Sequence, residues 1–143
     1  MRGKTAAFAV AVCLVTGGSL ATATPASATV DPPGGTWDHT WHTTDASPYG
    51  GTVYVEEYGD VVEVCDTAAD GYNANAWVYQ STGTYYVITT SGGNGSCATA
   101  RASDGVGYHN LPENETFHVN VYTCNNPDAP CAHQSDHTFL NDN

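Results

Sequence analysis

The stretch that decides the fold is ETFHVNVYT, residues Glu115–Thr123. Apolar and polar side chains alternate strictly along it. The apolar set, which would share one face of an extended chain, is Phe117, Val119 and Val121. The polar set on the opposite face is His118, Asn120 and Tyr122. Because successive side chains of a β-strand point to opposite faces of a sheet, the pattern predicts a strand with one face in a core and the other in water.

Shorter alternating runs precede this stretch. The expected strands are Thr52–Glu57, Asp60–Cys65, Ala76–Gln80 and Thr84–Thr90. Turn-forming residues separate them, while Ala98–Asn110 is irregular, with room for a short turn of helix. No long segment has the 3.6-residue period of a helix. These features predict an all-β fold, a small antiparallel β-sandwich of five or six strands.

The chain divides into three regions. Residues 1–28 have a basic start, an apolar run and a small-residue ending at Ala28, which together predict a secretory signal peptide. Residues 29–51 are rich in Pro, Gly, Thr and Asp without a sustained period, so we expect an extended N-terminal segment. Residues 52–143 would form the β-sandwich domain. We therefore expect a secreted, extracellular protein.

Four cysteines follow the expected signal peptide, namely Cys65, Cys97, Cys124 and Cys131. An even number in a small exported domain predicts two disulfides, for which three pairings exist. We favour Cys65 with Cys97 and Cys124 with Cys131. The reason is that the Asn-Asn-Pro and Ala-Pro turns of CNNPDAPC can bring the ends of the second pair together.

The negative charge of the chain limits the classes of partner that it can bind. It has 15 acidic and 3 basic residues, a net charge of −12, and Arg101 is the only permanent cation after residue 28. Such a surface repels phosphate backbones and anionic lipid headgroups, so we expect neither a nucleic-acid nor a membrane partner. Basic protein surfaces, cations and neutral glycans remain compatible with it. The alternative interpretation is that the negative charge only keeps an exported protein soluble.

Two groups of residues have spacings that resemble metal sites. One is Asp38, His39 and His42, and the other is Cys124 and Cys131 with His133 and His137. Six residues separate the two cysteines, whereas structural zinc sites usually have two to four, and we expect these cysteines to be bonded to each other. We therefore predict no metal and no cofactor.

No sequence pattern marks a catalytic centre. Neighbouring acids such as Glu56 and Glu57 are expected by chance among 15 acids, and the GxSxG motif is absent. Hydrolysis also needs a cleft that a sandwich of this size rarely builds. We predict that the protein is not an enzyme and that it works by binding.

Residues 35–45, GTWDHTWHTTD, place two tryptophans in a polar segment. In an extended strand Trp37, His39 and Trp41 would share one face, and an added strand can fill partner pockets with such side chains while its backbone pairs with a sheet edge. We therefore predict that these three residues bind a partner. The alternative is that the segment folds back as an edge strand of its own domain. The sequence leaves both open.

Three further stretches carry a resemblance: GGTVYVEEYGDVVEVCDTAADG (Gly50–Gly71), GGNGSC (Gly92–Cys97) and the Asn-Asp-Asn ending. They resemble a group of small secreted Streptomyces proteins, and among these the adaptor subunits of the umbrella toxin particles, antibacterial assemblies of actinomycetes. The resemblance implies a compact β domain that joins a lectin-bearing subunit to a large toxin-bearing subunit. It also implies that the N-terminal extension, here Thr29–Tyr49, lodges in a cleft of the lectin partner.

Two other functions fit a small, disulfide-bonded β protein. An inhibitor of a secreted hydrolase could present the Cys124–Cys131 loop, although the chain lacks the Trp-Arg-Tyr triplet of the amylase-inhibitor type. A small-molecule carrier would need a pocket lined by apolar and aromatic residues. Both remain alternatives to the adaptor.

Overall fold

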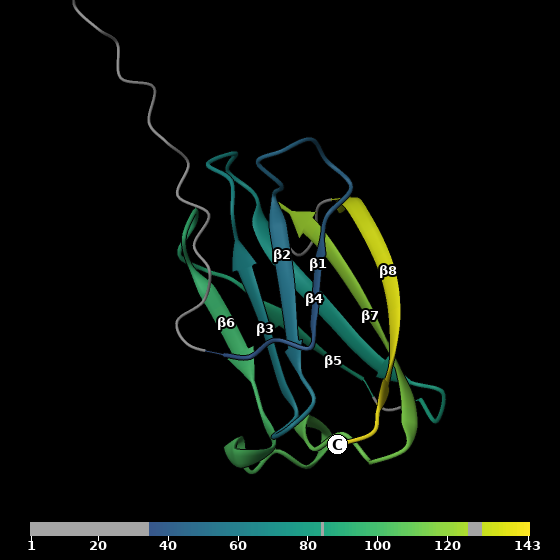
Figure 1. Cartoon of the computed structure of the whole chain (residues 1–143). Coiled ribbons are helices and arrows are strands. Elements are labelled where there is room, and N and C mark those ends of the chain that lie inside the picture. The colour runs from purple at the N-terminus through teal and green to yellow at the C-terminus, as the bar shows by residue number, and fades with distance from the viewer. Residues whose placement is uncertain (1–34, 84, 126–129) are drawn as a thin grey trace, which may run out of the picture.

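Strands dominate the computed structural model, which describes residues 35–83, 85–125 and 130–143. They form two antiparallel sheets of four strands, packed face to face (Figure 1). In spatial order the first sheet contains β1 (His39–His42), β2 (Gly51–Glu56), β3 (Val61–Asp66) and β6 (Cys97–Ala100). The second contains β5 (Tyr85–Thr89), β4 (Asn73–Gln80), β7 (Glu115–Cys124) and β8 (Ala132–Asn141). The predicted antiparallel sandwich is confirmed, with eight described strands instead of five or six.

Some predictions fall on residues that the structure does not describe. The expected signal peptide, residues 1–28, lies outside the described part of the chain, as do residues 29–34. So does Thr84, the first residue of one expected strand, and most of the turn expected within CNNPDAPC, residues 126–129.

Strand β7 follows its sequence pattern. Phe117, Val119 and Val121 are fully buried between the sheets, which confirms the predicted core face. The opposite face is less exposed to solvent than expected, since Asn120 is only 7% exposed. Its amide donates a hydrogen bond to Asp136 of β8 at 2.8 Å, and this pairing accounts for its burial.

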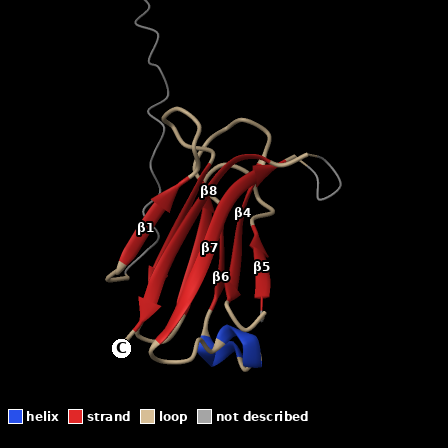
Figure 2. Ribbon diagram, turned by 90° about the vertical axis from the view of Figure 1, so that its right-hand side faces the viewer, coloured by secondary structure: helices blue, strands red, loops and turns tan. Residues whose placement is uncertain are grey.

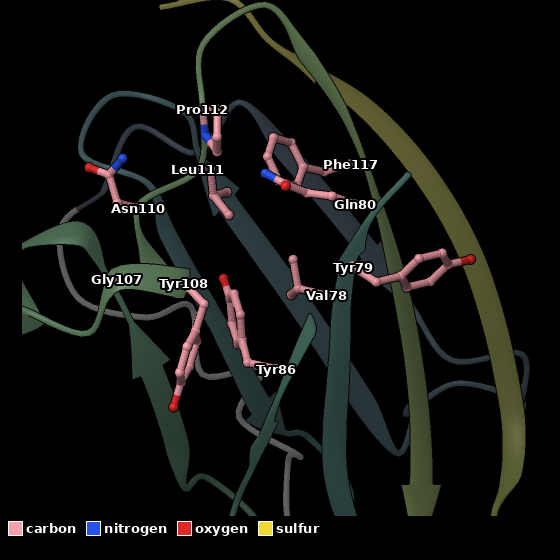
Figure 3. A pocket seen from close by; sticks show the side chains of 10 residues that line it. All are labelled: Val78, Tyr79, Gln80, Tyr86, Gly107, Tyr108, Asn110, Leu111, Pro112 and Phe117. Carbon is pink, nitrogen blue, oxygen red and sulfur yellow. The ribbon is translucent and has the colours of Figure 1, made fainter. Parts of the chain in front are cut away.

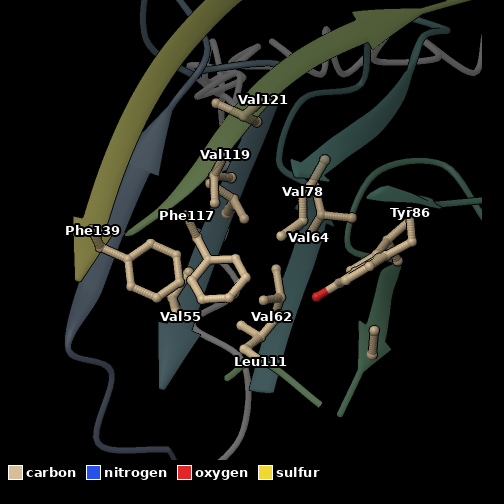
Figure 4. Close-up of a cluster of buried hydrophobic side chains, with 14 of the residues drawn as sticks. Val55, Val62, Val64, Val78, Tyr86, Leu111, Phe117, Val119, Val121 and Phe139 are labelled. Carbon is tan, nitrogen blue, oxygen red and sulfur yellow. The ribbon is translucent and has the colours of Figure 1, made fainter. Parts of the chain in front are cut away.

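Valines from both sheets fill the space between the layers (Figure 4). The fully buried or nearly fully buried members are Val53, Val55, Val62, Val64, Val78, Val119 and Val121. Each such side chain contributes about 1.5–3 kcal/mol by leaving water. The alternation that buries them also sends the intervening side chains to the outer faces, where they are available for binding.

Both favoured disulfide pairings are confirmed. The Cys65–Cys97 bond joins β3 to β6 at directly opposite positions and closes a separation of 32 residues. The Cys124–Cys131 bond joins the end of β7 to the start of β8 across 7 residues. Two disulfides are consistent with an extracellular protein.

The remaining elements lie at the periphery. Strand β1 comes from the segment expected to be extended, and it pairs antiparallel with β2 as the edge of the first sheet. Strands β6 and β8 were not expected. Strand β6 overlaps the start of the stretch expected to be irregular and forms the other edge of the first sheet, and β8 forms an edge of the second. Two short 3-10 helices, η1 (Ala102–Asp104) and η2 (Gly107–His109), lie together at one end of the sandwich (Figure 2). None of the helices in the described residues has the length or apolar composition of a membrane span.

Candidate binding groove

His39 and Trp41 lie on the inward side of β1. The Trp41 ring stacks between two imidazoles, 5.0 Å from that of His39 and 4.8 Å from that of His137, with interplanar angles of 6° and 5°. The same ring packs against the buried core cluster. Because β1 and β8 are edge strands of different sheets, this stack closes the sandwich along one side.

His39 is fixed further by a buried carboxylate. Its Nε2 lies 2.8 Å from Oε1 of Glu57, which follows β2 and is only 8% exposed. The side-chain amide of Asn143 donates to the other oxygen of this carboxylate at 3.3 Å. His39 and Trp41 were predicted to bind a partner, and in this structure both rings are engaged within their own domain.

The stack contains one pair that looks like catalytic machinery. Ser135 Oγ lies 2.7 Å from His137 Nε2, the spacing of a nucleophile and its base. The imidazole lies flat against Trp41, and burial lowers its pKa against the opposing effect of Asp136, which weakens it as a base. We therefore interpret the pair as part of the packing along this side.

Trp37 takes a different place from the other two predicted rings. It precedes β1, so the alternation of the strand does not extend to it, and it does not share the inward face as expected. Its ring lies against Tyr54 on the outer face of the first sheet, with centroids 5.4 Å apart and planes tilted by 45°. Trp37 and Tyr54 form one aromatic wall of a groove.

The groove has a volume of about 670 Å³ and lies over the outer face of β1 and β2. Its lining comes from four sources: the residues before β1, outward-facing strand positions, the loop between β1 and β2, and the residue just beyond β3. The lining residues are Gly35, Trp37, Thr40, His42, Ser47, Pro48, Tyr49, Thr52, Tyr54 and Thr67. We refer to this set as the groove.

A second aromatic pair lines the groove as well. The His42 and Tyr49 rings stack with centroids 4.5 Å apart and an interplanar angle of 11°. The loop that carries Tyr49 is held in place by Asp45, which accepts hydrogen bonds from the Gly50 amide at 2.6 Å and from the Thr43 hydroxyl. This second wall is therefore ordered by contacts within the protein itself.

Hydroxyl groups run along the groove beside these walls. His42 Nδ1 lies 2.9 Å from the Thr52 hydroxyl, which lies 3.4 Å from the Thr67 hydroxyl. The Thr67 hydroxyl in turn donates to the carbonyl of Tyr49. The Thr52 and Thr67 hydroxyls are only 3% and 7% exposed, and their hydrogen bonds lie within the protein. The hydroxyls that can donate to a ligand or accept from it are those of Thr40 and Ser47, which are exposed lining residues. No lining residue is an acid, which leaves His42 without a carboxylate partner for acid–base chemistry in the groove.

Only part of this site could be found in the sequence. Trp37 was singled out by its context, and the alternation within Thr52–Glu57 could have identified Tyr54 as outward-facing. Tyr49 reaches the groove from a loop, and Thr67 lies just beyond β3, so neither carries a periodic signal.

The residues with metal-like spacing are separated in the structure. Strand alternation puts His39 and His42 on opposite faces of β1, and Cys131 is bonded to Cys124. Among the described residues the one group with suitable distances is Glu63, Cys65 and Cys97. Two of its three members are the sulfurs of a disulfide, which are not available as thiolate ligands.

A second cavity, of about 120 Å³, lies at the end of the sandwich near the 3-10 helices. The hydroxyl of Tyr86 points into it between Val78 and Leu111 (Figure 3). Burial raises the pKa of this phenol well above its ordinary value, and the charge of Asp60 adds to the effect. The cavity has the volume of about four water molecules, which is too small for a peptide.

Comparison of the chain with models of known families, with curated proteins and with solved structures finds no match.

Proposed function

We propose that this protein is an exported, non-catalytic binding module that holds an extended segment of a partner protein in the groove. The observation that carries the proposal is the combination of two aromatic pairs with a neutral hydroxyl floor. Tyr and Trp rings provide a large contact area at low cost in side-chain entropy, and they dominate the binding energy of protein interfaces. The exposed hydroxyls of Thr40 and Ser47 can pair with the backbone groups of a bound segment.

The volume of the groove supports this role. At about 670 Å³ it lies within the range of about 300–1,000 Å³ that is usual for ligand-binding clefts. Its walls are held by contacts that exist before binding, such as the stack of His42 on Tyr49. A preformed site loses less entropy when a ligand binds, so affinity does not depend on ordering the walls at that moment.

Charge limits the composition of the bound segment. Carboxylates of Asp45 and Asp70 both approach Gly50, at the base of the loop that carries Tyr49. With a net charge of −12 and one cation after residue 28, the protein disfavours an acidic segment. We expect a neutral or basic segment whose apolar, proline or aromatic side chains contact the two aromatic pairs.

We further propose that the module acts as an adaptor in an extracellular antibacterial toxin assembly, with lectin-bearing and large toxin-bearing subunits as partners. The resemblance of Gly50–Gly71 and Gly92–Cys97 to secreted Streptomyces proteins supports this role. The signal-like residues 1–28 and the two disulfides also agree with a secreted component.

Capture from culture medium tests the proposal. A tagged chain would be compared with a Trp37→Ala/Tyr49→Ala variant and with a Tyr108→Ala control, whose ring is 50% exposed outside the groove. Captured proteins would be identified by mass spectrometry, and the affinity of each purified partner would be measured by calorimetry. We expect the groove variant to bind its partner at least about 30-fold more weakly, since two interface rings are removed.

The outcomes separate the possible functions. A lectin-like protein together with a very large secreted protein would support the adaptor, and a single hydrolase would indicate an inhibitor instead. A partner that the groove variant binds as tightly as the unmodified chain would show that the groove is not the site. Capture of no partner would contradict a protein-binding function, and a bound small molecule would favour a carrier.

A further inference from the structure

The outer face of the second sheet presents a second aromatic surface, which the proposed function does not use. The surface, called the platform from here on, consists of Asn75, Trp77, Tyr79, Val87, His118, Asn120 and Tyr122. Strand register places Trp77 between Val87 of β5 and Asn120 of β7. It also places Tyr79 opposite His118 and Asn75 opposite Tyr122. The platform therefore spans the three strands β5, β4 and β7, which lie side by side in Figure 2.

Rings on the platform contact one another. Tyr79 stacks on His118 with centroids 4.6 Å apart and planes at 6°, and Trp77 lies 5.1 Å from Tyr79. Trp77 nevertheless remains 42% exposed, although it is among the largest side chains in the described residues. A large exposed ring surface of this kind marks a binding site more often than an isolated exposed residue does.

Two hollows lie on either side of Tyr122. The first, of about 270 Å³, lies between Tyr122 and Val87 and includes the carboxamides of Asn73 and Asn75. The second, of about 240 Å³, includes Trp77 and the carboxamides of Asn120 and Gln134. Each hollow thus combines an aromatic ring with one accessible carboxamide, that of Asn73 or of Gln134. Its second carboxamide is nearly buried, since Asn75 and Asn120 are only 5% and 7% exposed.

Two of these carboxamides are oriented by the protein before any ligand binds. The hydroxyl of Thr89 donates to Asn75 Oδ1 at 2.8 Å, and Asn75 Nδ2 donates to the carbonyl of Asn73 at 3.0 Å. Asn120 Nδ2 donates to Asp136 at 2.8 Å. Fixed polar groups beside rings give directional recognition at low entropic cost.

The chemistry of the platform selects an uncharged, hydroxyl-rich ligand. None of its seven residues is an acid, in a chain that carries 15 of them, although Asp136 borders the platform through its hydrogen bond with Asn120. This carboxylate and the net charge of −12 repel anionic ligands. Sugar rings have C–H faces that pack on aromatic rings and hydroxyl edges that pair with carboxamides. We propose that the platform binds a neutral glycan chain, with adjacent sugar units in the two hollows on either side of Tyr122.

This site is independent of the groove. The groove lies on the outer face of the first sheet and the platform on the outer face of the second, with the core between them. A protein segment and a glycan can therefore be bound at the same time. Failure of one proposal would not entail failure of the other.

Affinity electrophoresis tests the glycan site. The full mature chain would be run in native gels that contain β-glucan, mannan, arabinoxylan or glycol chitin, and any polysaccharide that retards it would be followed by calorimetry with a matching hexasaccharide. We expect retardation by at least one of them. Trp77→Ala and Tyr122→Ala should each weaken hexasaccharide binding at least about tenfold, which corresponds to one lost ring contact.

Control variants make the result specific. Trp77→Phe keeps a ring and should retain part of the affinity, while Trp37→Ala in the groove and Tyr108→Ala outside both sites should be retarded like the unmodified chain. Near-ultraviolet circular dichroism would confirm that each variant is folded. The proposal is overturned if none of the four polysaccharides retards the protein, or if Trp77→Ala is retarded equally. Loss of a protein partner by Trp77→Ala, without any retardation, would make the platform a protein interface instead.

Discussion

The groove and the platform are built from similar residue types by different means. The groove owes its concavity to irregular chain, because Trp37 precedes a strand and Tyr49 belongs to a loop. The platform owes its breadth to strand register, since its rings occupy neighbouring positions of β4 and β7, and each of its two hollows has less than half the volume of the groove. A regular sheet face is thus sufficient for a broad surface, whereas a deep one requires segments that leave the strand pattern. The two faces should also respond differently to mutation.

The largest expected difference between the two faces is the loss of stability when their disulfides are removed. Cys65 lies opposite Thr52 of the groove floor. Cys131 borders both hollows of the platform. Removing Cys65–Cys97 with alanines should lower the free energy of unfolding by about 4 kcal/mol, because a long loop becomes free in the unfolded chain. Removing Cys124–Cys131 should cost about 2 kcal/mol, because its loop is much shorter. Urea unfolding measures both. Equal losses in the free energy of unfolding would show that strain or local packing, and not loop length, sets the contribution of each disulfide.

The second contrast is between Trp41 and Trp37. Trp41→Ala should cost about 3 kcal/mol of stability, because it leaves a gap between the imidazoles of His39 and His137. Trp37→Ala should cost less than about 1 kcal/mol and should instead weaken partner binding, because its ring lies on the outer face. Urea unfolding and calorimetry with the captured partner separate the two effects. If Trp41→Ala left stability unchanged but removed the partner, the prediction that Trp41 binds in a partner cleft would be favoured over packing within the domain.

Whether a strand could be predicted from the sequence depends on how apolar its inward positions are. Strands β2, β3, β4, β5 and β7 were predicted because their inward positions are apolar residues of the core, although β5 is an edge strand. Strand β8 was missed because its inward positions include Ser135, His137 and Asn141, which face the edge of the sandwich. Buried Asn141, for example, donates to the carbonyl of Leu111 at 2.8 Å, a contact that no local pattern reveals.

The same reasoning applies to the two candidate sites. Alternation along β4 and β7 predicts that Trp77, Tyr79 and Tyr122 face outward, so most of the platform could be predicted from the sequence. The groove depends on the course of the loop between β1 and β2, which is fixed by the contacts of Asp45 with Gly50 and Thr43. Contacts between residues of an irregular segment have no period, and for this reason only Trp37 was recognised in advance.

Acidification should affect the groove face before the platform. Burial holds the pKa of His137 below 6.5 in the folded protein, so the unfolded chain binds a proton more tightly than the folded one. The contribution of His137 to the free energy of unfolding therefore falls as pH drops through 6.5 toward the lower folded value, and it is constant above that window. His137 packs on β1 through Trp41, with His39 on the far side of that ring and Asp136 beside it. Protonation should thus loosen the strand that supports the groove.

The difference between the unmodified chain and His137→Gln isolates this effect. Urea unfolding between pH 7.5 and about pH 5 should show a steeper loss of stability in the unmodified chain, because only that chain carries the titrating imidazole. Partner binding should weaken more over this range in the unmodified chain than in His137→Gln, while glycan retardation should not differ between the two chains. An identical pH dependence in both chains would mean that His137 does not couple to folding. If acid weakened partner binding and glycan retardation equally, protonation of His137 would not act on β1 alone.

The smallest expected effect comes from adding one methyl group beside Trp37. A Cβ at Gly35 would lie 2.7 Å and 2.9 Å from two atoms of the Trp37 ring, closer than side chains tolerate, so the ring must turn away from its place against Tyr54. Gly35→Ala should therefore weaken partner binding a few-fold while changing the free energy of unfolding by less than about 0.5 kcal/mol. Gly107→Ala is the matched control, because a Cβ there would meet no atom within 4 Å. If Gly35→Ala bound the partner as tightly as the unmodified chain, the groove would not need a fixed Trp37 ring to bind. The groove would then depend less on its irregular segments than its geometry indicates.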